Sequence, residues 1–216
     1  MIVYLFDIDG TLLDAHGSGR AAFDAVMRAQ HGVEDASAGI RYGGKTDPAI
    51  IDEIFVARLG RTATATERAA FLSAYINELR GRLAVRVLDG AAESLAYLRG
   101  RVRLGIATGN IREGADAKLA AAGLAEWFEL GGYGCDSHVR AELVGRAIER
   151  ARERGEIREV IVVGDTIHDI AAARACGATA CAVATGSDPA SALAHADVVL
   201  ASLRELPAWH AARFGA

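Results

Sequence analysis

Short, continuously apolar runs alternate along this 216-residue chain with stretches that have the punctuation of amphipathic helices. Strands of a parallel sheet are apolar along their whole length because helices cover both faces, whereas half-exposed strands alternate with polar residues. The pattern therefore predicts an α/β fold with a doubly wound, mostly parallel sheet. The expected strands are 2–6, 102–107, about 127–131, 160–163, 179–183 and 197–200.

Glycine and proline mark the ends of the helices expected between these strands. Glycine favours the left-handed conformation that ends a helix, and a cap residue followed by proline is typical of a helix start. One helix begins at Asp89-Gly90 and ends at Gly100, and a helix over about 140–154 is followed by Gly155. Another is expected over about 112–122, and a further one begins at Asp188-Pro189.

Nearly seventy residues separate the first strand from the remainder of the sheet, and they have a helical pattern throughout. The expected helices are 18–31, one from Asp47-Pro48 to Gly60 with Asp47 as its cap, and one after Thr64, where Glu67 completes a capping box. A segment this long is too large for a loop. We therefore predict a small all-helical cap domain over 15–82, inserted into a core domain formed by 1–14 and 83–216.

Composition excludes several classes of partner. A net charge of −4 gives no broad positive surface for nucleic acid or anionic membrane. The three cysteines (Cys135, Cys176 and Cys181) have no C-x-x-C spacing, so they indicate neither a disulfide framework nor a zinc site and are expected in the core. The apolar opening at 1–6 is too short to span a membrane. We expect a cytoplasmic monomer or homodimer with a small-molecule partner.

Carboxylates follow the strands at the edge where parallel sheets bind ligands. Asp7 and Asp9 follow the first strand, and Asp165 and Asp169 follow the strand at 160–163. Each pair of like charges 4 Å apart costs about 4 kcal/mol at an effective dielectric constant of 20. A divalent cation removes this repulsion, and ligation by oxygen alone favours Mg²⁺. The residues therefore predict a Mg²⁺ site formed by Asp7, Asp165 and Asp169.

The same edge offers groups for phosphoryl transfer. With charge neutralised, Asp7 can attack phosphorus, while Asp9 can protonate the leaving oxygen and then activate water. Thr108 follows the strand at 102–107, and the backbone N–H groups of the loop from Gly109 and Asn110 precede a helix, where they can hold phosphoryl oxygens. An EF-hand is excluded, because Leu12 and Ser18 stand where that loop needs glycine and glutamate.

These residues resemble a known family. Asp7-x-Asp9-Gly10-Thr11-Leu12, Thr108 and Gly164-Asp165-x-x-x-Asp169 look like motifs I, II and IV of the haloacid dehalogenase superfamily, in its phosphoglycolate phosphatase-like branch with a cap after strand one. The resemblance implies a Rossmann-like core with sheet order 3-2-1-4-5 and an aspartyl-phosphate formed on Asp7. It also implies Mg²⁺ held by Asp7, the backbone carbonyl of Asp9 and Asp165.

The match with the family is weakest at motif III, where a lysine or arginine, often in Lys-Pro, is expected at the start of the helix before the Gly164-Asp165 strand. Here the sequence is Ser137-His138-Val139-Arg140. Arg140 is the first candidate for the cation that binds phosphate. Lys118 is the second, because it and Lys45 are the only lysines of the chain. His138 is a third alternative, and the position can also lack a cation.

The cap loop at 41–47 contains two more cations, Arg41 and Lys45, which could bind an anionic tail of the substrate. Together these features predict a Mg²⁺-dependent phosphatase for a small, phosphoglycolate-like phosphate monoester. A β-phosphoglucomutase-like phosphomutase is the alternative, since it shares the nucleophile and the metal. A non-catalytic binding module on the same fold is a further alternative. Dehalogenation of 2-haloacids is disfavoured, because Asp9 and the acidic cluster have no role in substitution at carbon.

Overall fold

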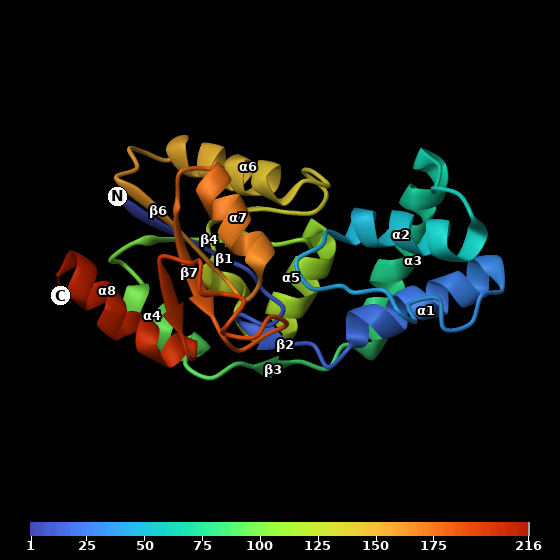
Figure 1. The fold of residues 1–216 in the computed structure, drawn as a ribbon, viewed down its shortest axis with the longest axis horizontal. Helices are drawn as coiled ribbons and strands as arrows, with labels where there is room; N and C mark the ends of the chain where they lie inside the picture. The colour runs from blue at the N-terminus through green and yellow to red at the C-terminus, as the bar shows by residue number, and fades with distance from the viewer. Residues whose placement is uncertain (216) are drawn as a thin grey trace.

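A computed structural model describes residues 1–215 and contains a six-stranded sheet in which every neighbouring pair is parallel (Figure 1). The spatial order is β5-β4-β1-β6-β7-β8. This confirms the α/β class and the core order 3-2-1-4-5, with β8 added at the edge. The strands are β1 (Ile2–Phe6), β4 (Arg103–Ala107), β5 (Leu130–Gly132), β6 (Glu159–Gly164), β7 (Thr179–Val183) and β8 (Val198–Leu200).

The register of the central strands brings their carboxyl ends to one line. Phe6, the last residue of β1, pairs with Ile106 of β4 on one side and with Val163 of β6 on the other. The residues that follow these strands therefore meet at a single edge of the sheet.

Helices cover both faces of the sheet because β1 is apolar on both. Tyr4 and Phe6 pack in one core cluster and Val3 and Leu5 in another, all fully buried. The first face carries α4 (Ala91–Leu98), α5 (Arg112–Ala121) and α8 (Leu206–Phe214), and the second carries α6 (Arg140–Arg152) and α7 (Ile167–Ala175). None of the helices in residues 1–215 is both long and apolar enough to cross a lipid bilayer.

Three helices lie beside the sheet and have a hydrophobic cluster of their own, which includes Phe23, Phe55 and Phe71 (Figure 1). They are α1 (Ser18–His31), α2 (Asp47–Leu59) and α3 (Ala65–Arg82). The expected capping box of Thr64 and Glu67 is present at the start of α3. We call 15–82 the cap and the remainder the core; this division into domains stays a prediction.

The two chain crossings between cap and core form a short antiparallel pair that the sequence did not predict. β2 (Leu13–Asp14) pairs with β3 (Arg86–Val87), so the entry and the exit of the cap are joined. Two residues per strand are too few to leave a period in the sequence, which explains why the pair was missed.

Several expectations were wrong in detail. Residues 190–195 form turns instead of a helix, because the Asp188 carboxylate pairs with Arg41 and accepts a hydrogen bond from the Ile167 N–H at 2.8 Å, away from its own segment. Only Cys181 is buried; Cys135 is exposed and Cys176 is half-buried. The strand expected over 127–131 is preceded by a 3-10 turn, Ala125–Trp127, and so begins later.

Candidate active site

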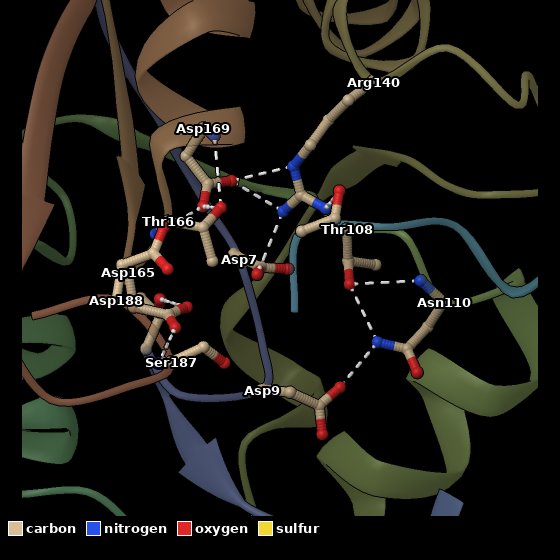
Figure 2. A network of polar contacts seen from close by, with 12 residues as sticks. Asp7, Asp9, Thr108, Asn110, Arg140, Asp165, Thr166, Asp169, Ser187 and Asp188 are labelled. Carbon is tan, nitrogen blue, oxygen red and sulfur yellow. Dashed lines mark hydrogen bonds and ion pairs between the residues drawn. The ribbon is translucent and has the colours of Figure 1, made fainter. Parts of the chain in front are cut away.

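Three neighbouring strands deliver side chains to the same cavity (Figure 2). Asp7 follows β1, Thr108 follows β4 and Asp165 follows β6, and all three are buried. The cavity has a volume of about 450 Å³ and is lined by residues of both the core and the cap.

Asp7, Asp165 and Asp169 form an acidic cluster in which one carboxylate oxygen from each lies within 4.8 Å of the others. Burial raises the pKa of Asp7 to about 6 and that of Asp165 to about 8, because the ionised form loses its hydration and faces other carboxylates. The cluster therefore holds negative charge at the carboxyl ends of β1 and β6 that one bound cation would stabilise. Hard oxygen donors fit Mg²⁺.

Arg140 lies against this cluster and is itself buried. Its Nε is 2.8 Å from Asp169 Oδ1, and its Nη2 is 2.9 Å from Asp7 Oδ2. Burial lowers the pKa of Arg140, but Asp169 and Asp7 more than offset this and leave the pKa raised. The guanidinium is therefore charged at all working pH values and is held beside Asp7.

Lys118 lies on the other side of the nucleophile candidate, near Asp9. The buried ammonium donates to Asp9 Oδ2 at 2.6 Å and to Asn110 Oδ1 at 2.7 Å. Asn110 Nδ2 in turn donates to Asp9 Oδ2 at 2.8 Å and to Thr108 Oγ1 at 2.9 Å (Figure 2). The two candidates for the motif III cation thus lie at different aspartates, and the exposed His138 contacts neither.

The loop after β6 is shaped by hydrogen bonds to its own aspartates. Asp169 and Thr166 form the capping box that begins α7, and Asp165 Oδ2 accepts a hydrogen bond from the Ser187 N–H at 2.7 Å. Gly10 approaches the same carboxylate so closely that an added Cβ would lie 2.6 Å from Asp165 Oδ2, and its φ of +81° also favours glycine. These contacts position Asp165 beside Asp7.

Comparison with known proteins identifies the family. The model of the haloacid dehalogenase-like hydrolases matches residues 3–177. The chain belongs to this family. It is 30% identical over 217 residues to a phosphoglycolate phosphatase of Cupriavidus necator, covering 94% of this chain and 90% of that protein. It is 28% identical over 216 residues to validoxylamine A 7'-phosphate phosphatase of Streptomyces hygroscopicus subsp. limoneus, covering 94% and 95% of the two chains.

A solved structure supports the same family assignment. The crystal structure of a haloacid dehalogenase-like hydrolase from Bacteroides fragilis superimposes with a TM-score of 0.73 at 25% identity, over 94% of this chain and 98% of that chain. The relatives found by sequence are named phosphatases, so this protein is a haloacid dehalogenase-like hydrolase of a group that acts on phosphate esters.

The cap of this haloacid dehalogenase-like hydrolase is docked on the loop after β4. The Asp47 N–H donates to the Gly109 carbonyl at 2.8 Å, and the Ile111 N–H donates to Asp47 Oδ2 at 2.8 Å. A Cβ on Gly109 would lie 2.0 Å from the Lys45 carbonyl oxygen, so only glycine allows this approach. The N-cap of α2 is Thr46 and not Asp47 as expected.

The two cations of the cap loop are both paired with acids. Lys45 bonds to Glu53 and Arg41 to Asp188. Among the described residues that line the cavity, Lys45 is present and Arg41 is not. Their predicted role in binding an anionic tail is therefore weakened, because each would first have to leave a partner.

Sequence reasoning missed several further residues of the cavity, among them Asp47 and Tyr75. Asp47 is buried, and burial raises its pKa to about 6. In the sequence, Asp47 stands out as an acid directly before a proline, but that pattern indicates a helix cap as well as it indicates a site residue. Tyr75 lies on the apolar face of α3 and has no sequence signal that separates it from a core residue.

Proposed function

We propose that this haloacid dehalogenase-like hydrolase is a Mg²⁺-dependent phosphatase, which hydrolyses a small phosphate monoester through an aspartyl-phosphate on Asp7. The observation that carries the proposal is the pairing of Asp7 Oδ2 with the Arg140 guanidinium at 2.9 Å, inside a buried acidic cluster at the strand ends. This arrangement provides a nucleophile together with a cation that a transferring phosphoryl group requires.

The cluster fits a divalent ion by its donor set. Asp7 and Asp165 would hold it together with the backbone carbonyl of Asp9, which the family resemblance implies. Asp169 has both oxygens engaged, Oδ1 with Arg140 and Oδ2 with Thr166, so we assign it chiefly to positioning these groups. When bound, Mg²⁺ would neutralise the carboxylates and polarise the phosphoryl group.

The chain's own groups account for both halves of the reaction. The Asp7 carboxylate forms a bond to phosphorus as the ester P–O bond breaks, and Asp9 donates a proton to the leaving oxygen. A water molecule then gives a proton to Asp9 and attacks phosphorus, and the bond between the Asp7 oxygen and phosphorus breaks. Inorganic phosphate is released and the Asp7 carboxylate is restored. Arg140, Thr108 and the Gly109 backbone would hold the phosphoryl oxygens.

Lys118 and Asn110 support Asp9 in this scheme. Asp9 is 41% exposed at its side chain, and without partners its carboxylate could adopt several orientations in the cavity. The ammonium of Lys118 and the amide of Asn110 converge on Oδ2 and leave Oδ1 for the leaving group. We assign both residues to positioning Asp9, with Asn110 also orienting the Thr108 hydroxyl.

The test is a panel of phosphate monoesters assayed for inorganic phosphate with and without Mg²⁺. Asp7→Asn removes the nucleophile and should lower turnover by several orders of magnitude, while Glu78→Gln, an exposed acid on α3, is the matched control. Full turnover by Asp7→Asn would contradict the proposal. Formation of an isomeric sugar phosphate without release of phosphate would instead identify a phosphomutase.

A further inference from the structure

Tyr75 is a buried residue of the cap whose hydroxyl group borders the cavity. The residue lies on α3 with 1% of its surface exposed, and its ring packs edge-on against Phe23 with centroids 4.6 Å apart. Among residues 1–215, no hydrogen bond to this hydroxyl is found, and Tyr75 lines the cavity. The ring packs inside the cap while the hydroxyl borders the cavity, so a ligand that enters the cavity can become its hydrogen-bond partner.

A glycine keeps open the space next to this hydroxyl. A Cβ on Gly19 of α1 would lie 3.7 Å from Tyr75 Oη and 4.0 Å from Lys118 Nζ. Lys118 uses two protons on Asp9 and Asn110, and an ammonium has three. The space is therefore bordered by one free ammonium proton and by a hydroxyl that can donate or accept.

The cations on the cap side of the cavity are already engaged. Lys45 pairs with Glu53, and Arg86 lies 3.4 Å from Asp14. Arg20 donates to the Ser37 carbonyl at 2.6 Å and to the Ile40 carbonyl at 2.7 Å, and stacks over Tyr42.

Anionic groups face the same space. Burial, together with Asp47 and Asp9 nearby, holds the pKa of Tyr75 well above its ordinary value, so the phenol is neutral. A carboxylate on the substrate would meet the Asp47 carboxylate and would find the cap cations in contact with protein groups, whereas a hydroxyl group would meet a matching donor and acceptor.

We propose that Tyr75 Oη and Lys118 Nζ bind a hydroxyl group of the leaving alcohol, so that the substrate is a phosphate ester of an uncharged polyol and not of a hydroxy acid. This rests on the proposed phosphatase function and deepens it. Tyr75 is then a specificity-determining residue that the cap contributes to the active site.

Three esters of similar size separate the alternatives: glycerol 3-phosphate, propyl phosphate without hydroxyl groups, and 3-phosphoglycerate with a carboxylate. We expect kcat/KM to be highest for glycerol 3-phosphate. In Tyr75→Phe, the ratio of kcat/KM for glycerol 3-phosphate over propyl phosphate should fall about tenfold, which corresponds to one lost hydrogen bond. In the control Tyr42→Phe the ratio should not change, because that hydroxyl already bonds to Ser37.

Gly19→Ala tests the space itself. The added Cβ would lie 3.7 Å from Tyr75 Oη and 4.0 Å from Lys118 Nζ, which are ordinary van der Waals distances, so the variant should fold. Its methyl group would occupy the position of the substrate hydroxyl and should raise KM for glycerol 3-phosphate more than for propyl phosphate, as in Tyr75→Phe.

Equal losses on both esters in the two variants, or a preference of the wild type for 3-phosphoglycerate, would overturn the subsite. In either case, turnover that still depends on Asp7 would leave the phosphatase proposal intact. Turnover retained by Asp7→Asn would instead refute the phosphatase proposal.

Discussion

Replacing Asp165 by asparagine should stabilise the metal-free protein, although it should abolish metal-dependent activity. Burial raises the pKa of Asp165 to about 8 from the ordinary 3.8, so at pH 7 the folded state must keep a proton that the unfolded chain releases. At pH 7, which is about 3 units above the ordinary pKa, keeping this proton lowers the free energy of unfolding by about 4 kcal/mol, at about 1.4 kcal/mol per unit. Asparagine has no such penalty.

The hydrogen bonds of Asp165 can be kept in the variant. The amide oxygen can accept from the Ser187 N–H, as Oδ2 does now, and the amide nitrogen can donate to the Thr11 hydroxyl, which now lies 3.2 Å from Oδ1. Allowing about 1 kcal/mol for weaker bonds, the net gain is about 3 kcal/mol. With a slope of about 2–3 kcal/mol per M, the urea midpoint should rise by about 1 M in EDTA at pH 7.

The stabilisation by Asp165→Asn should depend on pH. A carboxyl group whose folded pKa is raised destabilises the protein increasingly as pH rises from 3.8 to about 8. The advantage of Asp165→Asn should therefore shrink to less than about 2 kcal/mol at pH 5. A variant less stable than wild type at pH 7, or an advantage independent of pH, would refute this account of the cluster.

Asp169→Asn is the matched control with the opposite sign. Asp169 is the partner of the buried Arg140 at 2.8 Å and part of the capping box of α7. Weakening a buried ion pair and a helix cap should cost about 2–4 kcal/mol in the same urea experiment. Unchanged or increased stability would show that Arg140 does not need this partner.

Three further outcomes follow from the site. Mg²⁺ should raise the thermal midpoint of wild type more at pH 8 than at pH 5, because protons on Asp7 and Asp165 compete with the ion; an equal shift at both pH values would place the ion elsewhere. Arg140→Met should lower kcat by about 100-fold or more, with Arg140→Lys recovering part of the loss in steady-state assays. Gly109→Ala should displace the cap, because its Cβ would lie 2.0 Å from the Lys45 carbonyl, and a KM unchanged from wild type would argue against docking at this point.

The central residues of the site could be predicted because each directly follows a strand of the sheet. Once the apolar runs are assigned to a parallel sheet, Asp7, Thr108 and Asp165 must follow neighbouring strands at one edge, whatever the details of packing. No comparable rule predicts which side chains line the cap side of the cavity. The hydroxyl of Tyr75 reaches the cavity only because α3 packs beside α1, and the carboxylate of Asp47 reaches Ile111 only because the cap is docked. Helical periodicity places both residues on a buried face and cannot tell which neighbour they meet.

The two candidates for the phosphate-binding cation show where sequence spacing stops being informative. Arg140 begins α6 and Lys118 lies in the last turns of α5, and the long side chains of both can reach the strand ends. Spacing alone therefore treats them as competitors for one position. In the structure they pair with different carboxylates, Arg140 with Asp7 at 2.9 Å and Lys118 with Asp9 at 2.6 Å, and neither could take the other's place without leaving its own carboxylate without that partner. Each of the two aspartates therefore has a cation of its own in the folded site, a distinction that sequence spacing cannot make.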